Sequence, residues 1–161
     1  MMYYSSSYQS PFGTITLISD SINLVNLLIE NQKYSENILS SEFSQKDDLP
    51  VFIKTKKWLD DYFEGSNPTV YNLPLNPMGT KFRQEVWDLI CKIPYGQVTT
   101  YGEIAREIAM RKGIKTMSSQ AVGGAVGHNP ISIIIPCHRV VGANGNLTGY
   151  GGGIEMKIKL L

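Results

Sequence analysis

Near the start of the chain, hydrophobic and polar residues alternate in the way that predicts β-strands. Ser10-Pro11-Phe12-Gly13 is a turn signal, and residues 14–19 (TITLIS) then alternate between the two classes. A longer hydrophobic run over residues 22–30 predicts a second strand. Residues 35–48 are polar and predict a loop.

Residues 51–63 carry hydrophobic side chains at helical spacing, and Gly65 predicts the end of that helix. The stripe consists of Phe52, Trp58, Leu59, Tyr62 and Phe63. Residues 67–78 then hold three prolines with little periodicity, which predicts an inter-domain linker. We therefore expect an N-terminal α/β domain over residues 1–76, with this proline-rich segment at its end, and a second domain over residues 77–161.

The second half is predicted to be mostly helical. Its first amphipathic stripe consists of Phe82, Val86, Leu89, Ile90 and Ile93. Pro94-Tyr95-Gly96 predicts the end of that helix. Thr100 is the expected N-cap of the next helix, with Glu103 reaching back to the N-cap in a capping box. That helix points Ile104, Ala105 and Ile108 inward, and Gly113 predicts its end.

Ser118 can cap a third, short helix over residues 119–126, which a glycine closes. The pair resembles a helix-turn-helix, with a joint at residues 113–118 that is longer than the usual turn. The third helix is predicted to bury Val122 and Val126 and contains glycines, each of which costs about 1 kcal/mol relative to alanine. Two interpretations stay open: close packing against another helix, or a smooth face that a duplex backbone can approach.

Composition and charge extend this picture. Hydrophobic residues make up 42% and charged residues 18%, which is typical of a globular protein. Residues 1–76 carry five Lys/Arg against nine Asp/Glu, for a net charge of −4, whereas residues 77–161 carry ten against five, for +5. The basic second half indicates an anionic partner. The sequence thus predicts an α+β (α/β) fold, with a small N-terminal strand-and-helix domain followed by a mostly helical C-terminal domain with a helix-turn-helix.

Neither a signal peptide nor a membrane span is predicted. The beginning of the chain is rich in Tyr and Ser and lacks a basic flank and an apolar core. No hydrophobic run approaches the roughly 18 residues of a membrane helix. Cys91 and Cys137 are too few for a disulfide framework, so we expect a reducing, cytoplasmic location and no membrane partner. The two cysteines and two histidines are not closely paired, which argues against structural zinc.

Cys137 is the candidate for chemistry from the residues alone. Residues 131–135 form a strand-like hydrophobic run that Pro136 stops, and His138 follows the cysteine. A short helix beginning at Cys137 would place its positive end near the sulfur and favour the thiolate. Two interpretations stay open, a buried structural cysteine and a nucleophile. Cys91 lies in the first predicted helix of the second half, without such surroundings, and is predicted to be a core or edge residue.

Several motifs of the second half also occur together in one known family. They are residues 136–140 (PCHRV), residues 120–125 (QAVGGA) with Asn129-Pro130, residues 94–98 (PYGQV) with Thr100-Tyr101, and residues 149–153 (GYGGG). These motifs resemble those of the O6-alkylguanine-DNA alkyltransferases, also called methylated-DNA–protein-cysteine methyltransferases. Residues 136–140 resemble the active site of that family, and residues 120–125 with Asn129-Pro130 resemble its recognition helix and the loop after it. Residues 94–98 with Thr100-Tyr101 resemble the start of its helix-turn-helix, and residues 149–153 resemble its active-site loop. The resemblance is specific over about residues 79–161 and loose over residues 1–76.

The resemblance implies a monomeric DNA repair protein that acts once. It would hold double-stranded DNA through the minor groove and rotate the O6-alkylguanine out of the stack, because the alkyl carbon cannot be reached inside a duplex. The thiolate of Cys137 would then take the alkyl group as a thioether, which does not hydrolyse. The resemblance implies no metal and no organic cofactor.

Matching positions also imply roles for individual residues. Cys137 would be the nucleophile, and His138 would accept the thiol proton through a bridging water. Asn129 would tie the active-site turn together by side-chain to backbone hydrogen bonds. Tyr101 would reach the flipped base or its phosphate and donate a proton as guanine departs; from its spacing alone, it could equally be a core residue on the face of Ile104.

The resemblance further implies a DNA-binding surface and a substrate pocket. The DNA-binding residues would be Ser119, Gln120, Ala121, Gly123 and Gly124 of the recognition helix. The alkyl pocket would be lined by Val140, Tyr150, Gly151 and Gly152, with the carbonyls of Cys137 and Val140 reading the guanine amino group. Pro136 and Arg139 would be structural neighbours of the site, the arginine pairing with a carboxylate or a carbonyl.

Two positions depart from the family pattern. Gln120 stands where the family usually carries an arginine that fills the gap left by the flipped base, so we expect flipping to persist with weaker DNA binding. The chain ends at Leu161, before the position of the glutamate that orients the histidine in the family, so we expect His138 to be a weaker base. We also expect burial to outweigh the helix end, so that Cys137 is mostly a thiol at neutral pH.

Two other functions compete with alkyl transfer. One is a helix-turn-helix protein that binds lesions without efficient transfer, although relatives of that kind lack the cysteine. The other is a Cys/His hydrolase, which would turn over many substrate molecules and would not need a basic helix-turn-helix. Counting transfer events per protein molecule separates the three, as none, one or many.

Overall fold

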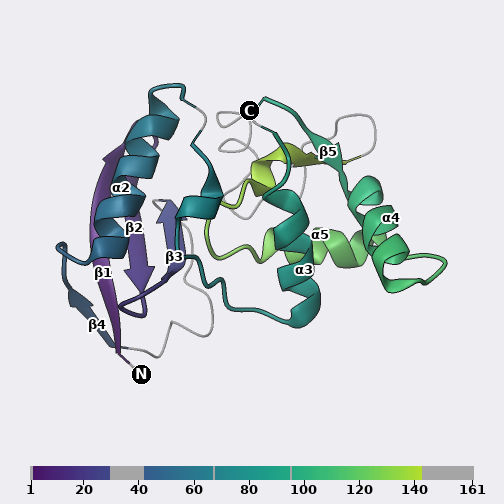
Figure 1. Cartoon of the computed structure of the whole chain (residues 1–161), viewed down its shortest axis with the longest axis horizontal. Helices are drawn as coiled ribbons and strands as arrows, with labels where there is room; N and C mark the ends of the chain where they lie inside the picture. The colour runs from purple at the N-terminus through teal and green to yellow at the C-terminus, as the bar shows by residue number, and fades with distance from the viewer. Residues whose placement is uncertain (1, 30–41, 67, 95, 143–161) are drawn as a thin grey trace. The chain divides into compact units, whose positions relative to one another are not determined.

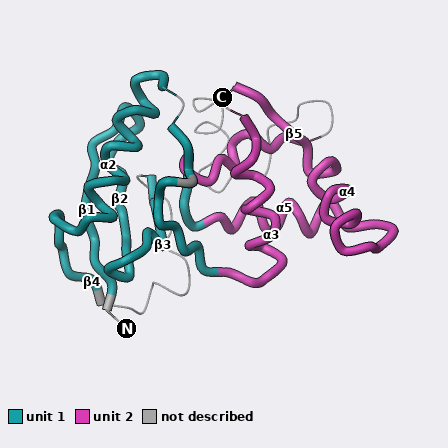
Figure 2. The backbone as a smooth tube through the Cα atoms, in the orientation of Figure 1, with its two compact units in different colours: residues 1–78, 130–132 teal, residues 79–129, 133–161 magenta. Residues whose placement is uncertain are grey.

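The computed structural model describes residues 2–29, 42–66, 68–94 and 96–142 of the 161-residue chain. The chain divides into two compact units (Figure 2). The first contains residues 1–78 together with residues 130–132, and the second contains residues 79–129 and 133–161.

The first unit is built on a four-stranded sheet with the order β3-β2-β1-β4 (Figure 1). Its strands are β1 (Met2–Ser10), β2 (Gly13–Ser19), β3 (Leu24–Ile29) and β4 (Glu42–Gln45). Neighbouring strands are antiparallel except for β1 and β4, which are parallel. The predicted turn and both predicted strands are confirmed, except that β3 begins at Leu24 because Asp20 Oδ1 accepts hydrogen bonds from the backbone N–H groups of Ile22 and Asn23.

Strands β1 and β4 were not expected from the sequence, because residues 1–10 show no strand pattern and residues 35–48 predict a loop; the loop prediction is wrong over Glu42–Gln45. Strand β1 carries tyrosines and serines, so it lacks the hydrophobic alternation that marks a strand. It is held instead by backbone pairing on both sides, and its buried Ser6 donates a hydrogen bond to Asp47 Oδ1 at 2.6 Å. This bond from Ser6 holds the pKa of Asp47 below its usual value.

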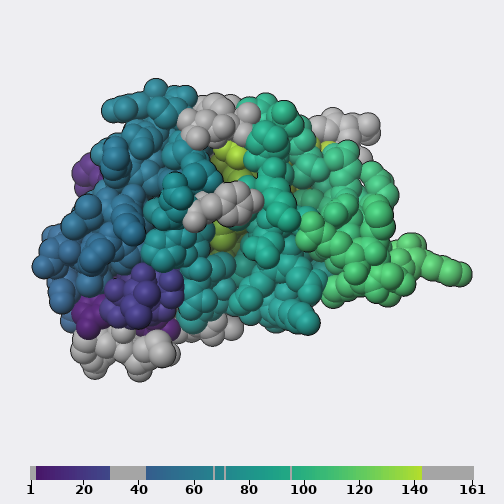
Figure 3. Space-filling model, in the orientation of Figure 1, coloured from purple at the N-terminus to yellow at the C-terminus, as the bar shows by residue number. Residues whose placement is uncertain are grey.

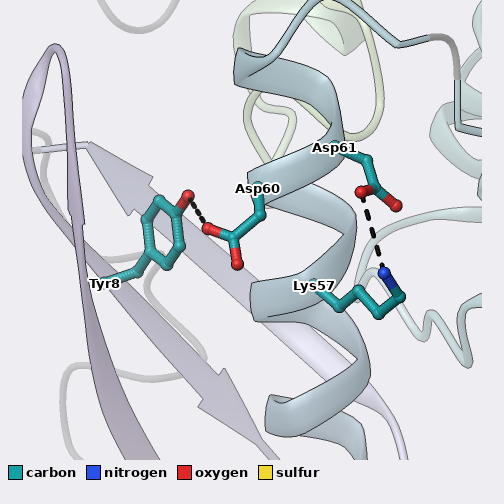
Figure 4. A network of polar contacts seen from close by, with 4 residues as sticks. All are labelled: Tyr8, Lys57, Asp60 and Asp61. Atoms are coloured by element: carbon teal, nitrogen blue, oxygen red, sulfur yellow. Dashed lines mark hydrogen bonds and ion pairs between the residues drawn. The ribbon is translucent and has the colours of Figure 1, made fainter.

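Helix α2 (Pro50–Phe63) packs on β1 and β2 (Figure 1). Phe52 and Leu59 of this helix are fully buried, as their helical spacing predicted. Figure 4 shows its polar side, where Tyr8 of β1 donates a hydrogen bond to Asp60 at 2.6 Å and Lys57 pairs with Asp61 at 3.8 Å. Burial and the Asp60 carboxylate both raise the pKa of the Tyr8 phenol.

The outer edge of β3 is paired by two irregular segments of the same unit. The Leu24 N–H donates to Pro74 O at 2.8 Å, so part of the expected linker at residues 67–78 lies along this strand. The Leu27 N–H donates to Pro130 O at 2.9 Å, and the Ser132 N–H donates to Leu27 O at 3.3 Å. These bonds cover an edge that would otherwise expose unpaired backbone groups.

The strand-like run at residues 131–135 is not a strand, which corrects the sequence analysis. Ile131 forms an isolated parallel bridge with Leu27, and the chain then turns at Ile133, whose φ is +69°. A β-branched residue rarely adopts this conformation. Its hydrophobicity is explained by burial, since Ile133, Ile134 and Ile135 are at most 2% exposed.

The described part of the second unit contains three α-helices that contact one another in pairs (Figure 1). They are α3 (Lys81–Ile90), α4 (Tyr101–Lys112) and α5 (Ser119–Gly127). Thr100 and Ser118 cap α4 and α5 as predicted, and Gly113 ends α4 with φ +68°. The predicted capping box is wrong in one respect, because the Glu103 carboxylate accepts from the Thr99 hydroxyl at 2.7 Å rather than from the N-cap backbone.

Candidate functional site

The candidate nucleophile lies in a single 3-10 turn, η2 (Cys137–Arg139), which packs against α3. The Cys137 N–H donates to Ile135 O at 2.7 Å, and the Arg139 N–H donates to Pro136 O at 2.9 Å. The expected short helix is therefore present, but only three residues long. Few peptide dipoles align in so short a turn, so its contribution to the acidity of the thiol is small.

The side chains of Cys137 and His138 are both buried, at 0% and 1% exposure. Burial disfavours a thiolate, whose charge would have to be compensated inside the protein. The Cys137 carbonyl accepts a hydrogen bond from the Val140 N–H, which closes the turn. Val140 itself is fully buried.

A two-stranded ladder brings Tyr101 to this turn. Strand β5 (Thr99–Thr100) pairs in parallel with β6 (Val140–Val141). Tyr101 directly follows β5 as the first residue of α4, so the ladder holds it beside the residues that follow Cys137. Burial raises the pKa of the Tyr101 phenol, and the nearby Cys137 raises it further when its thiol is ionised, so the phenol stays a proton donor at neutral pH.

Two further predicted site residues support the turn from outside. Asn129 Nδ2 donates to Ile135 O at 2.9 Å, so its amide holds the segment that leads into Cys137. Arg139 Nη1 donates to Ile93 O at 2.8 Å, which joins the turn to the end of α3. The structure therefore gathers Tyr101, Asn129 and Arg139 around the Cys137–His138 pair. Tyr150, Gly151 and Gly152 lie outside the described residues.

Trp87 is a structural residue of the site that the sequence analysis missed. It is 2% exposed, and its indole Nε1 donates to Ala125 O of α5 at 2.9 Å. It lies beside Val86 and therefore off the predicted stripe. Helix α3 contacts both α4 and α5, so it buries a wider face than the stripe covers. A hydrogen bond from a buried indole to a helix carbonyl fixes α5 relative to α3.

Four of the five residues predicted to bind DNA are exposed on one side of α5. Val122, Ala125 and Val126 are buried, while the side opposite is exposed. The exposed residues on that side are Ser119, Gln120, Ala121 and Gly124. Gly123 is half-buried, and a Cβ placed on it would lie 4.0 Å from Tyr101 Cδ1.

Gly124 separates the two interpretations of the helix glycines. A Cβ placed on it would have no described atom within 4 Å, apart from the backbone of its own helix and its chain neighbours. Close packing against another helix therefore does not account for this glycine. Space is left open beside the helix where the surface meets solvent.

The remaining cysteine and histidine lie elsewhere in the unit. Cys91 follows the last residue of α3, and burial, with a smaller contribution from Asp88, raises its pKa to about 12. His128 Nδ1 lies 2.7 Å from Gly124 O at the end of α5. Within the described part of the chain, His, Cys, Asp and Glu side chains form no group of three or more that could hold a metal ion.

The helices that the structure describes include none that is both long and apolar enough to cross a membrane.

Two family models match the chain nearly end to end. The ribonuclease-like domain of 6-O-methylguanine DNA methyltransferase matches residues 2–77, and the DNA-binding domain of the same protein matches residues 81–161.

Curated relatives agree with these matches. The Methylated-DNA--protein-cysteine methyltransferase of Haemophilus influenzae is 42% identical over 158 residues, which cover 98% of this chain and 84% of that protein. The Mycobacterium tuberculosis protein of the same name is 41% identical over 160 residues, with 99% and 91% coverage.

Solved structures share the fold. The crystal structure of the Mycobacterium tuberculosis O6-methylguanine methyltransferase superposes with a TM-score of 0.81 at 41% identity, covering 99% of this chain and 91% of that one. The Mycobacterium tuberculosis OGT in complex with DNA superposes with a TM-score of 0.80 at 40% identity, covering 100% and 91%. The α+β fold expected from the sequence is thereby confirmed.

Proposed function

The chain belongs to the 6-O-methylguanine DNA methyltransferase family and repairs DNA by methyl transfer to a cysteine, and we propose that Cys137 is that cysteine. The family membership of both halves and the geometry around the η2 turn support this assignment. The observation that carries it is the β5–β6 ladder, which brings Tyr101 to the turn that holds Cys137 and His138.

The proposed reaction is an in-line displacement at the O6-alkyl carbon of guanine. The sulfur–carbon bond forms as the carbon–oxygen bond breaks, and the electron pair of the broken bond stays on the guanine ring system. The thiol proton passes to His138, through a water, and Tyr101 supplies a proton to the departing guanine. Proton exchange with solvent restores both residues, so the net products are guanine and a cysteine thioether. A thioether does not hydrolyse, and each molecule therefore acts once.

The proposed positioning residues act through hydrogen bonds within the second unit. Asn129 holds the Ile135 carbonyl and Arg139 holds the Ile93 carbonyl, so both restrain the backbone on either side of the nucleophile. Displacement reactions depend steeply on the alignment of the attacking atom. Pro136 has a φ fixed by its ring and so restricts the backbone directly before Cys137. We propose that Val140 lines the alkyl pocket together with Tyr150, Gly151 and Gly152.

The proposed DNA surface is the exposed side of α5. Small residues at Ser119, Ala121, Gly123 and Gly124 let a phosphodiester backbone approach the helix closely, and Gln120 fills the gap left by the flipped base. We propose that a monomer binds the minor groove of the duplex in this way, with the alkylated base rotated out of the stack. The net charge of +5 on residues 77–161 supports binding to a polyanion.

We further propose that residues 77–161 are the DNA-binding and alkyltransfer domain and residues 1–76 a separate N-terminal α/β domain. The boundaries of the two family models support this division. Neither Cys91 nor Cys137 forms a disulfide bond in the described part of the chain. Because the acceptor must be a reduced thiol, the proposed site of action is the cytoplasm.

Mass spectrometry after incubation with duplex DNA containing O6-methylguanine tests the assignment. We expect one added methyl group per protein molecule, located on Cys137, and its loss in Cys137→Ser. Cys91→Ser is the matched control and should keep the full methyl gain, since its raised pKa makes that thiol a poor nucleophile. A methyl group on Cys91, binding without transfer, or many transfers per molecule would each overturn the proposal.

A further inference from the structure

We propose that Arg106 of α4 contacts a phosphate of the bound DNA next to the first turn of α5. The inference rests on the proposed function and extends the DNA surface from one helix to two. It concerns a residue outside the motifs that resemble the alkyltransferase family.

The position of the Arg106 guanidinium carries the inference. Gly102, one turn earlier on α4, has no side chain to fill the space before it. A Cβ placed there would have Arg106 Nη1, Ser119 Oγ and Thr100 Oγ1 each at 3.9 Å. The hydroxyl of the α4 N-cap Thr100, the hydroxyl of Ser119 in α5 and the guanidinium of Arg106 therefore converge on one small area of surface. Ser119 is the first residue of α5, so this area adjoins the exposed face of that helix.

The charge balance of α4 singles out the same residue. Arg111 pairs with Glu107 at 3.2 Å, and Lys112 pairs with Glu85 at 3.4 Å. Among the described residues, no carboxylate lies within ion-pair distance of Arg106. Its side chain is exposed, and Figure 3 shows the green atoms of α4 at the surface. The positive charge of Arg106 therefore faces solvent without a neighbouring carboxylate among the described residues. The charges of Arg111 and Lys112, in the last turn of the same helix, are each balanced by a carboxylate.

The chemistry of the guanidinium favours a phosphate as its partner. Its planar fork of N–H donors matches phosphate oxygens, and the nearby Ser119 and Thr100 hydroxyls can donate to the same group. An exposed guanidinium in solution contributes little to stability, so the fold does not require this arrangement. The position of the Arg106 guanidinium is explained if a polyanion binds beside α5, because phosphate contacts fix the register of a protein on the duplex.

The salt dependence of DNA binding tests the inference with a matched pair of variants. Arg106→Gln and Arg111→Gln remove one charge each from the same helix, but only Arg111 is paired with a carboxylate. Affinity for a short undamaged duplex would be measured by fluorescence anisotropy over a series of KCl concentrations. For Arg106→Gln we expect the slope of log affinity against log salt to become shallower by about 0.9, the loss of one phosphate contact.

The affinity difference between Arg106→Gln and the wild type should accordingly shrink about threefold between 50 and 200 mM salt. Arg111→Gln should keep the wild-type slope. Equal slope changes in the two variants would reveal only a general charge effect and would overturn the inference, as would an unchanged slope in Arg106→Gln. Arg106→Lys is a second variant, in case the glutamine variant does not fold. It should keep the slope and lose affinity, and wild-type affinity in it would also contradict the guanidinium contact.

Methyl transfer by the wild-type protein, measured separately by mass spectrometry, keeps the two hypotheses distinguishable. If transfer to Cys137 occurs and the Arg106→Gln slope is unchanged, only the phosphate contact is wrong. If the slope changes as expected and no transfer occurs, the proposed reaction is wrong and the contact stands.

Discussion

In the first unit three buried hydroxyls make hydrogen bonds within the unit, whereas in the described part of the second unit the buried polar side chain is that of His138, next to the proposed nucleophile. Ser6 donates to Asp47 at 2.6 Å, Ser19 donates to Asn23 O at 2.7 Å, and Thr55 donates to Val51 O at 2.7 Å, so each of these hydroxyls satisfies a local structural need. The second unit instead buries His138 beside Cys137. A buried pair of titratable side chains is a candidate functional site.

The two halves of the chain also differ in net charge and in where aromatic side chains cluster. Residues 1–76 carry a net charge of −4 and residues 77–161 a net charge of +5. Aromatic rings gather on the first unit, where Phe63 lies 6.3 Å from Tyr8, 5.6 Å from Phe12 and 5.2 Å from Tyr62, measured between ring centroids. We therefore expect substitutions in the first unit to change stability, whereas substitutions around Cys137 and on α5 should change methyl transfer or DNA binding.

The largest expected effect on stability comes from Phe52→Ala in the first unit. Phe52 is fully buried on α2, and truncating such a side chain leaves a cavity that costs about 3–5 kcal/mol of unfolding free energy. Urea denaturation would measure this loss. Below the transition, the remaining folded protein should still accept one methyl group. A loss under about 1 kcal/mol would contradict the packing of α2, and a loss of transfer by folded protein would break the division between the two units.

In the second unit, Tyr101→Phe should act on chemistry. General-acid groups contribute about 100-fold or more to rates, so we expect single-turnover transfer to slow by about that factor. Tyr101 is half-buried at the edge of α4, so the unfolding free energy should change little. Rapid-quench measurement of the methylated protein, together with urea denaturation, separates the two effects. Equal transfer rates in the wild type and in Tyr101→Phe would show that the Tyr101 hydroxyl does not take part in the reaction.

The pH profile sharpens the same prediction. Burial raises the pKa of Tyr101 above the usual tyrosine value, so any decline in rate caused by loss of the phenol proton should have its midpoint above that of an ordinary tyrosine. Deprotonation of the Cys137 thiol should make the rate rise with pH below that midpoint. A decline with a midpoint at or below pH 10 that disappears in Tyr101→Phe would show that the phenol titrates normally. A thiol-alkylation midpoint of Cys137 well below 7 would refute the expectation of a neutral thiol.

The helices and their caps could be predicted because their signals are local. Thr100, Ser118 and Gly113 each act on residues within one turn, so the sequence around them is sufficient. Strands β1 and β4 could not be predicted, because their partner strands hold them in place and polar side chains give no alternation. The turn at Ile133 was hidden in the same way, since five hydrophobic residues in a row are compatible with a buried strand or a buried turn.

The site was predictable in its residues but not in its assembly. The motif around Cys137 identifies the turn, and the spacing around Thr100 identifies the start of α4. Nothing local indicates that residues 99–100 pair with residues 140–141, since two-residue strands are too short to leave a pattern. Trp87 was missed for a related reason, because the helix contacts that bury it come from distant parts of the chain.

The smallest expected effect separates stability from DNA binding at one position of α5. Gly124→Ala should raise the unfolding free energy by about 0.5–1 kcal/mol, because alanine restricts the unfolded chain and the added Cβ meets open space. Duplex affinity should fall in the same variant if a DNA backbone approaches this face. Gly79→Ala is the matched control: its Cβ would lie 2.5 Å from Trp87 Cη2, so it should lose about 1–3 kcal/mol of stability through overpacking. Urea denaturation and anisotropy on one duplex measure both quantities. A Gly124→Ala protein that is more stable and binds DNA as the wild type does would show that the open face of α5 is not where the duplex lies.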